Sequence, residues 1–330
     1  MEKLGVGIVG IGHAGREHFT AFDENPDAEV RAAWAPSVRR LDLFPGSMDL
    51  FAPTYESMLD RDDIDIISLC SPNYAHADQA VAALEAGKHV ICEKPLATTL
   101  EDCERIVRMA DTKPSLKFMV GQSARFNPIC KTIKRMYDDG ELGEAFYAEA
   151  DYLHNIGNRI KDWWVDDRNP HFGLMGGGVH PIDLLRWIVG DIDEVFAISN
   201  HKVLAEFPHD DAYLMNFRFE NGCMGKMAAF LGCQRPYELN LAIYGTRGTA
   251  INDRLYLSKV EELEDFIRLP ITILAEHPTF GEEMAHFVDC ILNDGTPMID
   301  VRDGAKSAAT CIAGAESIET GKPVRVKNSF

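Results

Sequence analysis

The sequence predicts a doubly wound parallel α/β domain followed by a domain that combines helices with an antiparallel sheet. Three observations support this prediction. Apolar runs alternate with helical patterns up to about residue 125, a glycine-rich turn follows the first run, and closely spaced strand patterns dominate the second half. A chain of 330 residues, 46% of them hydrophobic, is long enough for two cores. We place the domains at residues 1–122 and 123–330.

The first domain contains five nearly continuous apolar runs, as expected for strands that are covered on both faces. They are residues 4–9, 29–34, 65–70, 89–92 and 117–120. Amphipathic helical patterns lie between them, and one of these ends at Gly87. Strand and helix alternating in this way indicate a parallel sheet.

The second domain begins with a different pattern. Residues 128–140 are predicted as a helix that ends at Gly140, and residues 145–154 alternate like a half-buried strand. After a helix over residues 179–190 come five strand candidates between residues 194 and 258, which predict an antiparallel sheet. Two further helices, around residues 282–295 and 303–321, complete the predicted elements.

Composition and charge exclude several classes of partner. The 33 Lys and Arg against 52 Asp and Glu give a formal charge of -19, which opposes binding to nucleic acid or to an anionic membrane. We find no apolar run of membrane-spanning length and no signal peptide, so we expect a cytoplasmic protein. The eight cysteines contain no C-x-x-C pair and are predicted to be buried, reduced thiols; no metal site is expected.

A glycine-rich turn over residues 10–15 follows the first strand and opens the first helix. Gly10 would permit a tight turn, Gly12 would let the backbone approach a pyrophosphate, and Gly15 would allow close helix packing. The helix N-terminus would present free N–H groups to the same anion. An ordinary glycine turn is the alternative, but the strand-turn-helix context favours a dinucleotide site.

The end of the second strand carries information about the cofactor. An acidic residue there would bind the adenosine ribose of NAD, but residues 34–40 contain no carboxylate. Ser37, Arg39 and Arg40 could instead bind a ribose 2′-phosphate. The sequence therefore favours NADP over NAD, with a solvated basic turn as the alternative.

Polar residues follow the third and fourth strands, at the sheet edge where doubly wound folds bind ligands. Ser71-Pro72-Asn73 follows the third strand, and His76 opens the next helix, where it could equally be a helix cap.

Glu93-Lys94-Pro95 follows the fourth strand. Pro95 disfavours helical geometry at Lys94, so the lysine should be extended and could reach the crevice. There it could hydrogen-bond a substrate hydroxyl and favour its deprotonation. The alternative is a surface lysine in a loop.

A second candidate site lies in the helix over residues 179–190. His180 and Asp183 are three residues apart and therefore share a face, and Gly176-Gly177-Gly178 could leave the backbone free to approach a ligand. A histidine beside a carboxylate can exchange a proton near neutral pH. The alternative is a capping or core histidine.

Taken together, these motifs resemble the Gfo/Idh/MocA family, which includes glucose-fructose oxidoreductase and inositol dehydrogenase. The resemblance rests on the glycine-rich turn, the final helix and residues 71–76, 86–96, 125–128 and 176–187, so it spans nearly the whole chain. It implies a Rossmann domain followed by an α+β domain that binds substrate beside an open, mostly antiparallel sheet.

The resemblance also implies an activity. It implies a tightly held NAD or NADP and hydride transfer at a secondary alcohol of a sugar, sugar derivative or cyclic polyol, or reduction of the corresponding ketone. Lys94 then matches the family's catalytic lysine, His180 its proton-transferring histidine and Asp183 the acidic residue that positions the site.

One position departs from the family pattern. Gly176 stands where many of its dehydrogenases have an aspartate that helps to bind the reacting hydroxyls. Asp166, Asp167 and His171 are near in sequence and could replace it.

The predicted site residues form two sets. The cofactor-binding set is Gly10, Gly12, His13, Ala14, Gly15, Ser37, Arg39, Arg40, Ser71, Pro72, Asn73, His76, Glu93, Lys94, Gln122, Trp163 and Trp164. The substrate-binding set is Lys94, Arg125, His154, His171 and His180.

We also expect self-association. The open sheet has apolar positions that need a cover, namely Ala228, Phe230, Leu241 and Ile243. This predicts a homo-dimer or homo-tetramer formed through the C-terminal sheet.

Two other functions stay open at this stage. One is a glycosidase or lyase that uses a recycled, bound NAD, and the other is a non-catalytic regulatory protein that senses a dinucleotide or a sugar. The glycine at position 176 slightly favours the second, whereas intact Lys94 and His180 favour an enzyme.

Overall fold

The computed structural model describes residues 2–36, 44–169, 171–260, 265–271 and 279–330. Ser37, Arg39 and Arg40, which the sequence assigns to the cofactor, lie outside the described residues. The chain forms two compact units. The first unit is Met1–Ser123 with Pro278–Ala305, and the second unit is Ala124–His277 with Lys306–Phe330. The segment around residues 282–295, which we placed in the second domain, thus belongs to the first unit.

The first unit is built on a five-stranded parallel sheet in the order β2-β1-β3-β4-β5. This order is that of a doubly wound α/β fold and confirms the predicted fold class. The central strand β3 and its neighbour β4 are almost entirely buried, as their continuous apolar sequences predict. The strands are β1 (Leu4–Val9), β2 (Ala28–Trp34), β3 (Ile66–Leu69), β4 (His89–Glu93) and β5 (Phe118–Gly121).

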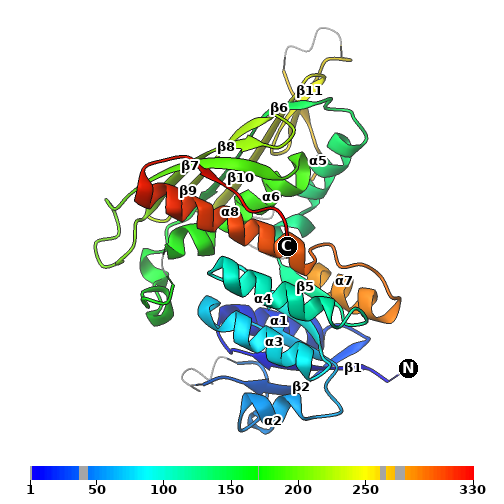
Figure 1. The fold of residues 1–330 in the computed structure, drawn as a ribbon. Helices are drawn as coiled ribbons and strands as arrows, with labels where there is room; N and C mark the ends of the chain where they lie inside the picture. Colours follow the sequence, from blue (N-terminus) through cyan, green and yellow to red (C-terminus); the bar gives the residue numbers. More distant parts are fainter. Residues whose placement is uncertain (1, 37–43, 170, 261–264, 272–278) are drawn as a thin grey trace. The chain divides into compact units, whose positions relative to one another are not determined.

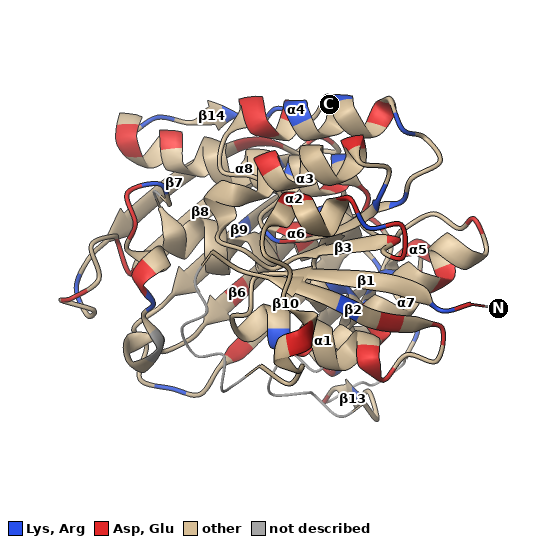
Figure 2. Cartoon of the chain, turned by 90° about the horizontal axis from the view of Figure 1, so that it is seen from below, with Lys and Arg blue, Asp and Glu red and all other residues tan. Residues whose placement is uncertain are grey.

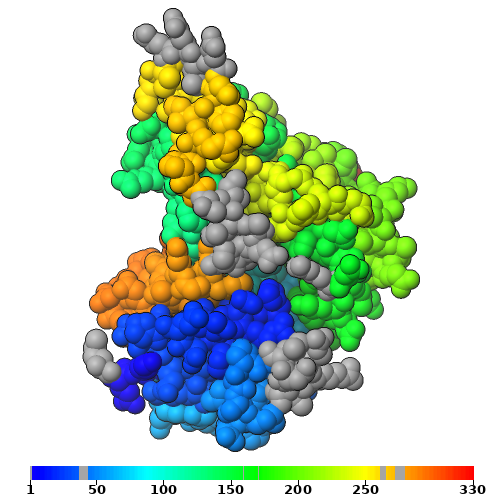
Figure 3. All heavy atoms as spheres, turned by 180° about the vertical axis from the view of Figure 1, so that it is seen from behind, coloured from blue at the N-terminus to red at the C-terminus, as the bar shows by residue number. Residues whose placement is uncertain are grey.

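Helices of the first unit cover this sheet (Figure 1). They are α1 (His13–Asp23), α2 (Tyr55–Leu59), α3 (His76–Glu85), α4 (Leu100–Asp111) and α7 (Phe280–Leu292). The α4 helix begins where the Thr99 hydroxyl accepts the Asp102 N–H, at 3.1 Å, which satisfies one of its free amides. The α7 helix packs on α1, and Figure 3 shows its orange surface against the blue N-terminal segment.

The second unit contains a nine-stranded sheet among its described residues, in the order β13-β12-β11-β10-β6-β9-β8-β7-β14. Among the described strand pairs of this sheet only β6 and β9 are parallel, which confirms the mostly antiparallel prediction. The strands are β6 (Ala145–Leu153), β7 (Ile192–Asn200), β8 (Ala212–Phe219), β9 (Met224–Phe230), β10 (Glu238–Gly245), β11 (Gly248–Ile251), β12 (Arg254–Leu257), β13 (Ile267–Arg268) and β14 (Val324–Arg325).

Three α-helices accompany this sheet: α5 (Pro128–Asp138), α6 (Val179–Val189) and α8 (Val301–Thr320), the last of which begins in the first unit. One turn of π-helix, Gly173–Gly178, leads into α6. Such turns are rare and occur frequently at functional sites.

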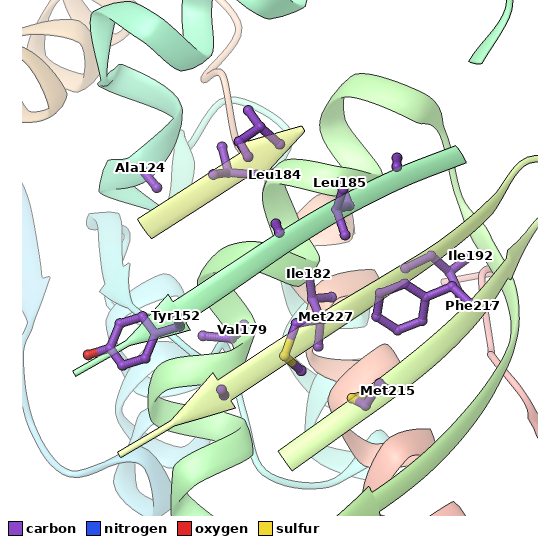
Figure 4. Close-up of a cluster of buried hydrophobic side chains, with 14 of the residues drawn as sticks. Ala124, Tyr152, Val179, Ile182, Leu184, Leu185, Ile192, Met215, Phe217 and Met227 are labelled. Carbon is purple, nitrogen blue, oxygen red and sulfur yellow. The ribbon is translucent and has the colours of Figure 1, made fainter. Parts of the chain in front are cut away.

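The core of the second unit lies between α6 and the inner face of the sheet. Figure 4 shows Val179 and Ile182 of α6 facing the strands that carry Tyr152, Met215 and Met227. Alternate residues of each strand point toward this core, as the period-two pattern of the sequence predicts.

The strand register corrects two of the expected exposed positions. Leu241 and Ile243 are 2% and 0% exposed and belong to the core, so they do not need an external cover. Ala228 is also buried, at 3%, so Phe230 is the one exposed residue of the four. The opposite face of the sheet instead carries the exposed side chains Phe196, Ile198 and Met224. Our sequence analysis chose the wrong face of β10 because alternation shows that a strand has two faces but not which one is covered.

Acidic residues are spread over the helices and the loops of the chain, as Figure 2 shows. This distribution fits the formal charge of -19. None of the helices in the described ranges is both long and apolar enough to cross a membrane.

Candidate active site

The glycine-rich turn of the first unit has the geometry that a dinucleotide site requires. Gly10 has a φ of +93°, and a Cβ there would lie 2.5 Å from the Cys70 carbonyl oxygen, so only glycine fits. A Cβ on Gly15 would overlap the Gly10 carbonyl. A Cβ on Gly12 would have no described atom within 4 Å, and α1 begins at the next residue. The turn therefore leaves open space at the helix N-terminus.

Two buried amides lie near the carboxyl ends of the neighbouring strands. Asn73 follows β3 and Gln122 follows β5, and both side chains are at most 4% exposed. The Asn73 Nδ2 and both amide atoms of Gln122 have no hydrogen-bond partner among the described residues. Because buried polar groups are almost always paired, these amides are suited to a polar ligand at this sheet edge. The residues of this edge thus fit a dinucleotide.

Two other predicted cofactor residues use their polar atoms within the protein. The ring of His76 is fully buried, and its two nitrogens contact the carbonyl oxygens of Pro95, at 2.8 Å, and Ser71, at 3.0 Å. Burial lowers the pKa of His76. The Ser71 hydroxyl donates to the side chain of Gln79. His76 therefore bridges the loops after β3 and β4.

Glu93 ends β4 in the first unit, and Lys94 follows it. Lys94 is half-buried, and its backbone N–H donates to Glu93 Oε2 at 3.1 Å. Glu93 Oε1 lies 3.3 Å from His18 Nε2 on α1. Burial raises the pKa of Glu93, but the hydrogen bond and charge of His18 outweigh it and hold that pKa below the ordinary value. Glu93 is therefore an ionised, internally bonded carboxylate.

His180 is buried near the start of α6, within a group of aromatic rings from the second unit. The Tyr152 ring is stacked on it, with centroids 5.9 Å apart and planes at 13°. The Tyr152 hydroxyl bonds His154 Nδ1 at 3.0 Å, and the Tyr237 ring packs edge-on against both Tyr152 and His154. We call these four residues the His180 cluster.

The sequence analysis identified His180 and His154 but missed Tyr152 and Tyr237. Tyr152 lies near the end of β6, two residues before His154, so the alternation predicted over residues 145–154 already put them on one face. Tyr237 directly precedes β10 and carried no local signal.

The three glycines before His180 serve packing within the second unit, which corrects the expectation that they leave backbone free for a ligand. A Cβ on Gly176 would lie 2.8 Å from the Phe172 ring, and one on Gly177 would lie 2.9 Å from the Tyr152 ring. Glycine at position 177 thus lets Tyr152 lie close to the backbone beside His180. An aspartate at position 176 would collide with Phe172.

Asp183 has a set of partners that its sequence neighbours did not reveal. Its carboxylate accepts two hydrogen bonds from the Arg125 guanidinium, at 2.7 and 2.8 Å, and both side chains are 1% exposed. The Ser307 hydroxyl of α8 also donates to it, at 2.9 Å. Arg125, which we had placed on the substrate, is therefore a buried partner of Asp183. The bidentate pair ties α6 to the segment before α5.

The segment before α6 contains further predicted residues. Trp164 stacks on Phe172, with centroids 4.8 Å apart, and Trp163 meets the same ring edge-on at 5.3 Å. His171 has a φ of 53° and contacts Glu319 at 3.2 Å.

Asp166, considered as a replacement for the missing aspartate, is bonded to Arg168. Hydrogen bonds from Arg168 lower the pKa of Asp166 to about 2, so it is a poor proton acceptor near neutral pH.

Comparisons with known proteins agree with this fold. Residues 4–122 match the family model described as "Oxidoreductase family, NAD-binding Rossmann fold", and residues 130–251 match the "GFO/IDH/MocA C-terminal domain". The chain is 26% identical over 350 residues to the uncharacterized oxidoreductase YrbE of Bacillus subtilis, covering 99% of this chain and 98% of that one. It is 27% identical over 330 residues to inositol 2-dehydrogenase 3 of Saccharopolyspora erythraea, with 97% and 95% coverage.

Solved structures show the same fold. An oxidoreductase domain protein from Kribbella flavida superposes with a TM-score of 0.90 at 24% identity, over 99% of this chain and 100% of that one. Levoglucosan dehydrogenase in complex with NADH and L-sorbose superposes with a TM-score of 0.88 at 24% identity, over the full length of both chains.

Proposed function

The chain belongs to the Gfo/Idh/MocA oxidoreductase family, and from this premise we propose that it oxidises a secondary alcohol of a sugar, sugar derivative or cyclic polyol, or reduces the corresponding ketone. It is an NAD(P)-dependent dehydrogenase. The observation that supports the substrate class is the His180 cluster, in which ring nitrogens and phenolic hydroxyls, groups that can hydrogen-bond a molecule rich in hydroxyl groups, lie close together. The inositol and levoglucosan dehydrogenases among its relatives support the same class.

The first unit would hold the dinucleotide. Gly10 and Gly12 with the N-terminus of α1 would bind the pyrophosphate, and the Asn73 and Gln122 amides would hydrogen-bond the cofactor. When bound, the nicotinamide supplies the hydride acceptor or donor.

Two side chains would act on the reacting hydroxyl. His180 would take the proton of the reacting hydroxyl, and Lys94 would stabilise the negative charge that develops on the oxygen. The Tyr152 ring, stacked on the imidazole, would keep it oriented. Asp183 would act indirectly. Its carboxylate accepts hydrogen bonds from Arg125 and Ser307 and so fixes the helix that carries His180.

A panel of sugars, sugar acids and inositols tests the proposed function. We expect at least one member to reduce the nicotinamide, seen as growth of its absorbance band. Product without any net change in that band would instead identify a recycled, bound cofactor and a lyase or glycosidase. Tight dinucleotide binding with no product from any member would favour a sensor.

The predicted preference for NADP is tested by comparing the affinity of the protein for NADP and for NAD. Charge-assisted contacts from Arg39 and Arg40 are worth about 1.5–3 kcal/mol each, so NADP should bind tighter than NAD by a decade or more. Calorimetric titration measures this, and the combined Arg39→Ala and Arg40→Ala variant should lose the difference. Arg61→Ala, an arginine that pairs with Asp63 elsewhere in the first unit, is the control. Equal affinities in the unmodified protein would exclude the preference.

We further propose a homo-dimer or homo-tetramer formed through the outer face of the second unit's sheet. Phe196 and Ile198 on β7 and Met224 and Phe230 on β9 are 37%, 54%, 61% and 38% exposed there. Apolar patches of this kind usually mark an interface. Light scattering should give a multiple of the 36.8 kDa chain mass, and Ile198→Glu should lower it. A particle of 36.8 kDa for the unmodified protein would refute the proposal.

We place the protein in the cytoplasm. All eight cysteines are free thiols in the structure, and most of them are buried. Such thiols suit a reducing compartment.

A further inference from the structure

A buried group of polar side chains behind Lys94 has no part in the mechanism so far. His18 of α1, Ser68 of β3 and Glu283 of α7 are completely buried, and Glu93 at the end of β4 is nearly so. All belong to the first unit. His18 Nδ1 lies 2.7 Å from Ser68 Oγ and His18 Nε2 lies 3.3 Å from Glu93 Oε1. Glu93 Oε2 in turn accepts the Lys94 backbone N–H.

These contacts join a serine, a histidine and a glutamate, as in the catalytic triad of a hydrolase, but Ser68 is not placed to act as a nucleophile. A nucleophilic serine must be reachable by substrate, whereas Ser68 lies inside the central strand β3 and is 0% exposed. The chain of contacts instead ends on a backbone amide, that of Lys94. Its effect is therefore to fix the peptide that leads from β4 into the lysine.

Glu283 lies three residues after Phe280, whose ring is 5.4 Å from that of His18, so it is on the face of α7 that packs on α1. Its charge therefore matters to the His18–Glu93 pair. Burial lowers the pKa of His18, but the Cys70 thiol and the Glu93 carboxylate raise it well above the ordinary value. A positive His18 beside a negative Glu93 is neutral overall. Burial, and then the charge of Glu93, raise the pKa of Glu283 to about 8, although His18 acts in the opposite direction. Neither carboxyl oxygen of Glu283 has a hydrogen-bond partner among the described residues.

We propose that Glu283 is a positioning residue for Lys94, because only its neutral form leaves the His18–Glu93 pair intact. An ionised Glu283 would place a second carboxylate in this water-poor site, where it repels Glu93 and competes for His18. Glu93 would then release the Lys94 amide. The catalytic role of Lys94 rests on the proposed function, whereas the pH-dependent release of its backbone amide by Glu93 does not.

The surroundings of the group restrict which titrations can contribute. The titratable side chains that face it are His18 on α1, Cys70 after β3, and Cys92, Glu93 and Lys94 on and after β4. From α7 itself, Phe280 covers the His18 ring at 5.4 Å. Burial raises the pKa of Glu283 to about 8, which lies inside the pH range of the experiment below.

Glu283→Gln tests the proposal, because glutamine keeps the shape of the side chain and cannot ionise. Glu282→Gln, the same change at the exposed neighbouring position, is the matched control. Hydrogen exchange of peptides that cover Lys94, corrected for intrinsic rates, is measured from pH 6.5 to 9.5. The kcat of the best panel substrate is measured over the same range.

In the unmodified protein and in Glu282→Gln we expect exchange around Lys94 to rise above pH about 8, and kcat to fall about tenfold per pH unit beyond it. In Glu283→Gln both changes should be absent. Persistence of the exchange rise in Glu283→Gln, or its absence from the unmodified protein, would overturn the proposal. An exchange switch without any dehydrogenase activity would support the positioning role and count against the proposed function instead.

Discussion

Lys94→Ala and His180→Ala should each lower kcat by about 10²- to 10⁴-fold while dinucleotide binding stays largely intact. The reason is that these side chains are proposed to act on the reacting oxygen, whereas the pyrophosphate would be held by Gly10, Gly12 and the N-terminus of α1. Steady-state kinetics on the best panel substrate give kcat, and calorimetry gives cofactor affinity. Lys3→Ala, at an exposed lysine of the same unit, is the control and should change neither quantity.

A near-normal kcat in His180→Ala would show that another group accepts the proton. Asp166 is a poor successor because Arg168 holds its carboxylate and lowers its pKa to about 2. Asp167 and His171 would then be the next candidates. A loss of cofactor affinity equal to the loss of kcat would show that the variant had disturbed the fold and not the chemistry alone.

Asp183→Asn should lower the free energy of unfolding by about 3–5 kcal/mol. The substitution removes the charge that neutralises Arg125, whose guanidinium is 1% exposed and would remain buried without a counter-charge. The loss would appear in urea unfolding as a lower midpoint at an unchanged slope. Asp166→Asn breaks an exposed pair with Arg168 and should have little effect.

A double variant separates the cost of an unpaired charge from the value of the pair. Arg125→Met with Asp183→Leu removes both charges and leaves apolar groups, so it should lose much less stability than Asp183→Asn alone. If Asp183→Asn and Asp166→Asn were equally stable, Asp183 would not be needed to neutralise the buried Arg125 guanidinium. A Ser307→Ala variant removes the hydroxyl that donates to Asp183 and accepts from Arg186 Nη1, and it leaves the Arg125–Asp183 pair in place. Its loss of stability should therefore lie between those of Asp166→Asn and Asp183→Asn.

Local features of the sequence were sufficient to determine the first unit's sheet and its glycine turn. Continuous apolar runs predict strands that are covered on both sides, and alternation with helices predicts that those strands are parallel. Gly10 is required by a positive φ and by the nearby Cys70 carbonyl, and the strand-turn-helix context already indicated such a turn. These features depend on residues close together in the chain, so the sequence alone could determine them.

Only the tertiary structure decided which distant residues meet. Arg125 and Asp183 are 58 positions apart, and α7 brings Phe280 against His18 from a distant part of the chain. Periodicity tells which side of a helix or strand is apolar, but not which partner covers it, and a buried charge depends entirely on that partner. For the same reason the glycines before His180 suggested an open backbone, whereas packing against Tyr152 and Phe172 fills the space beside them.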